Sequence, residues 1–158
     1  MKSNHRKIFI TVTRVLFALY IILLAYFCFF SERYGRTLVS EDYRYNLTLF
    51  KELKRFITYR KVLGIENFII NIFGNVLAFM PFGFALPIIS ASNRKFINIV
   101  ILSLELSLTI ELIQIILKVG AFDVDDLFLN TMGGMIGGIC FFICCGIVKG
   151  IQKKDCEH

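Results

Sequence analysis

Four long apolar stretches constrain the fold of this 158-residue chain more than any other feature. They cover residues 8–30, 68–89, 96–117 and 127–148, and each is long enough to cross a bilayer, which takes ~20 mostly apolar residues per helix. The chain is 56% hydrophobic, above the ~45–50% usual in soluble domains. Because backbone groups inside lipid must satisfy one another, the stretches should be helical. We therefore predict an all-α, polytopic membrane helix bundle that forms a single domain over residues 1–158.

The connection between the first two stretches carries an amphipathic pattern. In LTLFKELKRFITYRKVLGI, apolar residues recur at helical spacing from Leu49 to Ile57, while basic residues occupy the other faces. This pattern predicts a short amphipathic helix. Such a helix either lies against anionic lipid headgroups or packs as a solvated helix on the rest of the protein.

Lysines and arginines flank the apolar stretches asymmetrically. With four spans, the basic groups near both termini and at Arg94 and Lys95 fall on one side of the membrane, which the positive-inside rule makes cytoplasmic. The link that holds Lys118 and three aspartates, Asp123 to Asp126, then lies outside. The connection over 31–66, with eight basic and five acidic residues, opposes this assignment locally. We expect a multi-pass cell-membrane protein with cytoplasmic N- and C-termini and an extracytoplasmic aspartate link.

Polar side chains recur along one face of three spans. If the third and fourth spans are antiparallel neighbours, their polar side chains lie at a similar depth near the outer face. The asparagines of the second span can then complete the group with neutral hydrogen-bond donors. An acidic side chain near the bilayer centre costs ~2.5–3.5 kcal/mol on insertion scales, so these groups should face one another rather than lipid. The candidate polar pocket comprises Glu111, Gln114, Asp123, Asp126, Asn130, Asn71 and Asn75.

Other residues within the spans have structural interpretations. Small pairs at Gly133/Gly137 and Gly134/Gly138 predict a close helix contact. Pro81 predicts a kink or a break in the second span. Glu105 lies on a different face from Glu111, close to mid-span, and should face protein, water or a partner.

The polar pocket is compatible with several kinds of chemistry. Clustered carboxylates can hold protons near neutral pH, or bind a divalent cation or a cationic headgroup through oxygen ligands. They can also form a structural network, and the aspartates can cap a helix N-terminus. Both histidines are terminal, so no Ser/His/Asp or Cys/His constellation is available in the membrane, and no phosphate loop or nucleic-acid motif is present. We expect no cofactor and no nucleic-acid partner, and a non-enzymatic role is favoured.

Four motifs occur in order over about residues 40 to 145: NLTLF, NVLAFMPFGFALP, ELIQ and FDVDDLFLNTMGGMIGG. They resemble the VanZ-like family, named for an accessory protein of glycopeptide resistance clusters that lowers susceptibility to teicoplanin, a lipid-tailed drug that binds wall precursors. Many members carry an arginine shortly before the first aspartate, where this chain has VGAFD. By resemblance, the motif residues include Asn46, Phe50, Pro81, Gly83 and Gly134.

The resemblance implies a role in glycopeptide (teicoplanin) resistance or cell-envelope modification. Membrane lipids are the expected partners, with a lipid-linked wall precursor or a lipoglycopeptide as the implied ligand. Two alternatives stay open: a small transporter of protons or lipids that uses the carboxylates, and a membrane enzyme that acts on a lipid-linked envelope precursor with the aspartates as acid/base groups or metal ligands.

Overall fold

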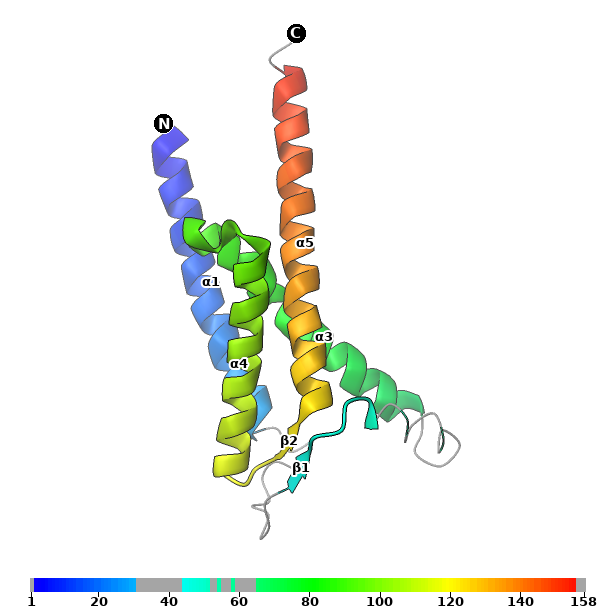
Figure 1. Ribbon diagram of the computed structural model, residues 1–158. Helices are drawn as coiled ribbons and strands as arrows, with labels where there is room; N and C mark the ends of the chain where they lie inside the picture. Colours follow the sequence, from blue (N-terminus) through cyan, green and yellow to red (C-terminus); the bar gives the residue numbers. More distant parts are fainter. Residues whose placement is uncertain (1, 31–43, 52–53, 55–57, 59–64, 156–158) are drawn as a thin grey trace.

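The computed structural model describes residues 2–30, 44–51, 54, 58 and 65–155 (Figure 1). Four long helices dominate it: α1 (Lys2–Phe30), α3 (Ile65–Ile89), α4 (Phe96–Ile116) and α5 (Val124–Asp155). Each contains a segment long and apolar enough to cross a membrane, namely Lys7–Phe30, Asn71–Ile89, Phe96–Ile116 and Val124–Lys149. The predicted polytopic helix bundle is confirmed. The predicted amphipathic helix lies largely outside the described residues.

Both chain termini lie at one end of the bundle, and the short strands lie at the other (Figure 1). The 3-10 helix η2 (Ala91–Arg94) joins α3 to α4 at the terminal end. At the opposite end, strand β2 (Ala121–Asp123) joins α4 to α5 and pairs in parallel with β1 (Arg44–Asn46). Three-residue strands are too short for a period-2 pattern, so no sequence pattern predicts them.

Glycines allow α3 and α5 to pack backbone against backbone. A Cβ atom at Gly137 would lie 2.0 Å from the Met80 carbonyl oxygen, and one at Gly83 would lie 1.9 Å from the Gly134 carbonyl oxygen. Helix α4 packs against Gly134 from another side, because a Cβ atom at Gly134 would lie 2.0 Å from Ser103 Oγ. The predicted close contact of small residues is therefore confirmed, and α5 is the central helix of the bundle.

Helix α1 packs more loosely than the other three helices. Its buried residue Leu24 joins Phe79 and Ile110 in one apolar cluster, whereas Ile22 is 67% exposed on the outer face. Most outward side chains of α1 are apolar, as expected for a helix that faces lipid, and Arg14 is the charged exception well inside the span. Loose packing of α1 against α3 leaves the space that forms the cavities described below.

Helix α3 continues through both of its prolines, Pro81 and Pro87, so of the predicted kink or break the break does not occur. Pro81 has no backbone N–H and cannot donate to the carbonyl of Leu77, four residues earlier. Next to this gap, the Tyr20 hydroxyl donates a hydrogen bond to the Ala78 carbonyl at 2.6 Å. A side chain of α1 thus supports the α3 backbone near Pro81, as exposed backbone groups at membrane depth require.

We predict that Gly134→Ala strongly destabilises the protein. The added methyl group has no room beside Ser103, and overpacking of this kind costs about 1–3 kcal/mol. Thermal unfolding in detergent measures the effect. Gly146→Ala is the matched control, because a Cβ atom at Gly146 meets nothing within 4 Å. Equal unfolding temperatures for the two variants would contradict the packing described here.

Candidate functional site

The pairing of β1 with β2 brings a distant residue to the first aspartate of α5. In this register Asn46 lies opposite Asp123, and the Asn46 side-chain amide donates to Asp123 Oδ1 at 3.1 Å. Asn46 is buried, and its own Oδ1 accepts the Thr48 backbone N–H. The two residues are 77 positions apart, so only the three-dimensional fold places an amide donor beside this carboxylate.

Asp123 also caps helix α5. Its Oδ1 accepts the backbone N–H of Asp125 at 2.8 Å, which is the usual bond from an N-cap side chain to the second helical residue. The backbone N–H of Asp123 in turn donates to Glu111 Oε2 at 3.0 Å. Glu111 is only 2% exposed. A buried carboxylate of α4 therefore fixes the start of α5, and the capping explanation accounts for part of the acidic cluster.

Asp125 is a site residue that the sequence did not single out. It is buried, and its Oδ1 accepts the backbone N–H of Phe50. At ~100° per residue, Asp125 falls on a different face of the helix from Asp126, so periodicity alone points it away from the pocket. The chain segment after β1 covers that face, and no sequence pattern indicated this contact.

Phe50 adopts an unusual backbone conformation at this contact. Its φ is 63°, in the left-handed region that a bulky residue rarely enters. The ring of Phe50 packs edge-to-face on Phe128, with the centroids 5.6 Å apart. Strain of this kind costs about 1–3 kcal/mol and persists only where surrounding contacts enforce it. Asp125 and Phe128 provide those contacts, and both belong to α5.

A second group of polar side chains lies deeper in the bundle than Asp123. The Asn75 amide of α3 donates to Asp126 Oδ1 at 2.6 Å. One turn further along α5, the buried Asn130 amide donates to Ser107 Oγ of α4 at 2.9 Å. Asn130 Oδ1 accepts no hydrogen bond from any described residue. An acceptor of this kind requires a water molecule or a ligand donor.

The other two residues of the candidate polar pocket take different positions. Gln114 is buried, but its amide donates to the Cys28 carbonyl at 2.9 Å and so ties α4 to α1. Asn71 lines a cavity between α1 and α3 together with Asn75.

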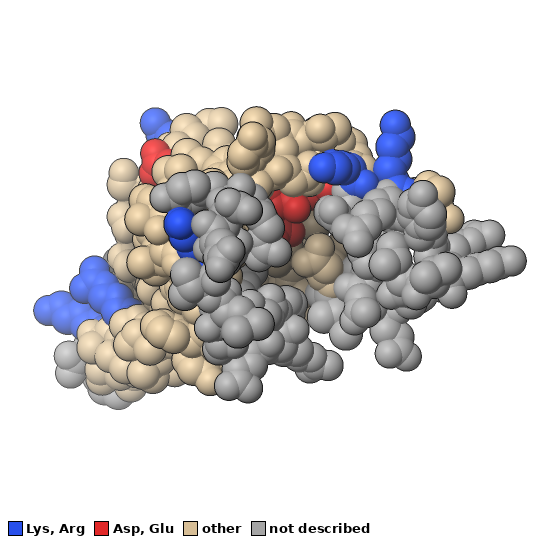
Figure 2. Space-filling model, turned by 90° about the horizontal axis from the view of Figure 1, so that it is seen from below, with Lys and Arg blue, Asp and Glu red and all other residues tan. Residues whose placement is uncertain are grey.

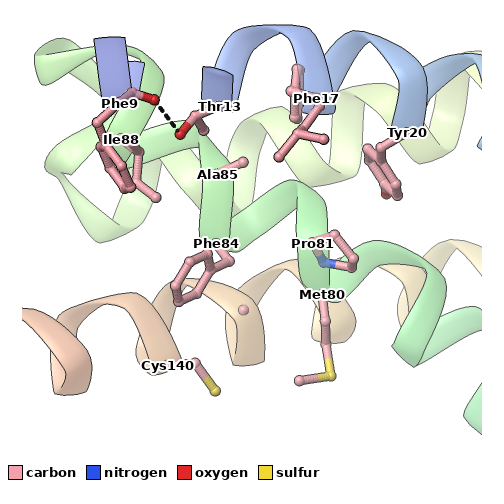
Figure 3. A pocket seen from close by; sticks show the side chains of 12 residues that line it. Phe9, Thr13, Phe17, Tyr20, Met80, Pro81, Phe84, Ala85, Ile88 and Cys140 are labelled. Atoms are coloured by element: carbon pink, nitrogen blue, oxygen red, sulfur yellow. Dashed lines mark hydrogen bonds between the residues drawn. The ribbon is translucent and has the colours of Figure 1, made fainter. Parts of the chain in front are cut away.

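Two cavities follow the boundary between α1 and α3. The first, about 390 Å³, contains Asn71, Asn75, Cys28 and Leu24 in its wall. The second, about 540 Å³, is surrounded by apolar side chains of α1, α3 and α5, and Figure 3 shows Phe17 facing Ala85 and Phe84 across it. Tyr20 and Pro81 line both cavities. We call the two together the α1/α3 groove.

The candidate polar pocket is rich in carboxylates. Donors to these carboxylates include the amides of Asn46 and Asn75 and the backbone N–H of Asp123. Among the described residues, no three His, Cys, Asp or Glu side chains are grouped so that they could hold a metal ion. Figure 2 looks onto this end of the molecule and shows acidic atoms at the surface, with Lys and Arg side chains around them.

Comparisons with known proteins agree with the motifs in these helices. Residues 17–145 match the model of the VanZ/LLP1 family. The chain is also 31% identical over 126 residues to Protein VanZ of Enterococcus faecium, which covers 80% of this chain and 71% of that protein. This chain belongs to the VanZ family. No solved structure matches it. Gly83 and Gly134, which the resemblance implies as motif residues, contact each other at the α3–α5 crossing.

We predict that Asp123→Ala destabilises the protein by about 1–3 kcal/mol, because it removes an N-cap and the acceptor for Asn46. Asp123→Asn keeps an oxygen that can cap α5 and should retain most of the stability. Thermal unfolding in detergent tests both variants. If Asp123→Asn is as unstable as Asp123→Ala, the negative charge rather than the cap stabilises this end of the bundle.

Proposed function

We propose that this protein binds a lipid-tailed molecule of the cell envelope, with the polar head at the polar pocket and the tail in the α1/α3 groove. By this binding it contributes to glycopeptide (teicoplanin) resistance. One observation carries the proposal: Asn75 lines the groove and also donates to Asp126. A polar site and an apolar site of the same molecule are therefore continuous.

The groove suits an aliphatic tail. Its larger cavity, about 540 Å³, has a size typical of small-molecule sites, which measure ~300–1,000 Å³. The wall is formed by side chains such as Leu16, Phe84 and Ile88. A tail that enters from the surrounding lipid leaves one apolar environment for another, so it gains through packing contacts rather than through the hydrophobic effect.

The polar pocket favours one class of head group over another. Carboxylates accept hydrogen bonds, so a matching head carries N–H and O–H donors. A lipoglycopeptide supplies them through its peptide and its sugars. The phosphates of a phosphate-linked wall precursor present acceptor oxygens, which cannot donate hydrogen bonds to carboxylates. Of the two ligands that the family resemblance implies, the lipoglycopeptide fits better.

The proposal also requires the polar pocket to face outward. Among the described basic residues, Lys7, Arg94, Lys95 and Lys149 belong to the end of the bundle where the termini lie, whereas Arg44, Lys51, Lys54 and Lys118 belong to the other end. We assign the terminal end to the cytoplasm, because its basic residues directly flank the spans in short segments, where the positive-inside rule applies most strongly. The polar pocket at the opposite end is then accessible to a drug that arrives from outside.

Expression in a susceptible bacterium should raise tolerance to teicoplanin far more than tolerance to vancomycin. Asp126→Asn and Ala85→Phe should each reduce the gain in teicoplanin tolerance about tenfold. Asp126→Asn weakens the polar pocket, and Ala85→Phe fills the α1/α3 groove. Ile97→Phe is the matched control, since Ile97 is exposed on α4 outside both cavities. Equal membrane levels are verified by immunoblotting.

Two results would argue against the proposal. An equal shift for vancomycin and teicoplanin would show that the lipid tail is not recognised. An Ala85→Phe variant as active as Ile97→Phe would show that the groove is not used. A precursor-binding protein would instead be recognised by a direct interaction of the purified protein with a lipid-linked precursor and none with teicoplanin.

A further inference from the structure

Glu105 has no role in the polar pocket and lies on the outside of the bundle. It is the tenth residue of the 21-residue helix α4, so it falls at mid-membrane depth. Its side chain is exposed. Among the described residues, no hydrogen bond or ion pair engages its carboxylate, and the Thr109 hydroxyl donates only to the Glu105 backbone carbonyl. Of the expected surroundings of Glu105, namely protein, water or a partner, the described residues of the single chain do not provide the first.

The direction of Glu105 follows from helix geometry. The buried face of α4 contains Ile99, Ser103, Ser107 and Ile110. Glu105 is two residues beyond Ser103, which places it roughly 160° around the helix from that residue. It therefore points away from α3 and α5 and into the lipid region. A carboxyl group at this depth is rare without a partner.

The residues around Glu105 form a stripe with the spacing of a helix–helix seam. Ile101, Glu105, Leu108 and Leu112 follow one another at intervals of four, three and four residues, and all four are exposed. Intervals of three and four keep side chains on one face and allow knobs-into-holes packing against a parallel helix. One polar residue within such a seam fixes its register. We call these four residues the α4 stripe.

We propose that the α4 stripe is the interface for a second copy of this chain, with Glu105 of each copy hydrogen-bonded to Glu105 of the other. Two copies with the same membrane orientation place Glu105 at the same depth by symmetry. One protonated carboxyl group can donate to the other, so the pair is self-complementary. The α4 helices are then parallel, as the stripe requires.

The described part of the chain offers no better partner for Glu105 within the membrane. Among the described residues, Arg14 is the other exposed charged residue well inside a span. Its guanidinium group donates to the Ile89 carbonyl at the terminal end of α3, at 3.4 Å. Arg14 is therefore directed toward the membrane surface, and the self-pairing of Glu105 remains the simplest way to remove the carboxyl group from lipid.

Disulfide cross-linking of purified protein in liposomes tests this interface. The parent for the experiment has alanine at the five native cysteines: Cys28, Cys140, Cys144, Cys145 and Cys156. Leu108→Cys in this parent should form a covalent dimer on oxidation that persists when the protein is diluted in lipid. Leu77→Cys is the matched control, because Leu77 is exposed on α3, outside the stripe. It should remain monomeric.

Substitution of Glu105 then tests the carboxyl pair. With Leu108→Cys present, Glu105→Leu should lower the cross-linked fraction at high lipid dilution about tenfold, and Glu105→Gln, which keeps a donor and an acceptor, should restore most of it. Thermal unfolding verifies that each variant is folded. Equal cross-linking of Leu108→Cys and Leu77→Cys, or no effect of Glu105→Leu, would overturn the proposal.

Discussion

The absence of water inside a bilayer is the constraint on which this structure depends. Polar groups there must find partners in the protein, because lipid tails offer none. In this chain several polar residues of α4 and α5 meet this requirement by facing one another and the amides of α3 and β1, whereas Glu105 points outward. Apolar side chains occupy most of the outer surfaces, and glycines bring α3 and α5 close enough for short polar side chains to reach across.

The polar pocket is assembled at one end of the bundle from helix termini and a short strand pair. Glu111 accepts a hydrogen bond from the Asp123 backbone N–H, and the Asp123 side chain caps α5. Asn46 reaches Asp123 through the pairing of β1 with β2. These contacts serve stability. Three residues after Asp123, Asp126 accepts a hydrogen bond from Asn75, which lies in the wall of the α1/α3 groove. We propose that the same arrangement also gives a ligand head a polar surface to contact.

Much of the fold could be predicted from the sequence, because span length, helical periodicity and glycine spacing are local properties. The four spans and the Gly133/Gly137 contact belong to this class. Contacts between distant segments could not be predicted. Nothing in the sequence showed that Asn46 pairs with Asp123, that the Phe50 backbone approaches Asp125, or that Gln114 bonds to the Cys28 carbonyl. The outward direction of Glu105 also depends on which face of α4 the other helices cover.

Asn75 and Asp126 join the polar pocket to the groove, so their coupling is the most direct test of the account. A double-mutant cycle of Asn75→Ala and Asp126→Ala, measured by unfolding in lipid nanodiscs, isolates the interaction between the two side chains. A hydrogen bond from an amide to a carboxylate predicts a coupling energy of about 1 kcal/mol or more. Additive effects, within ~0.5 kcal/mol, would show that these side chains do not interact and would contradict the account.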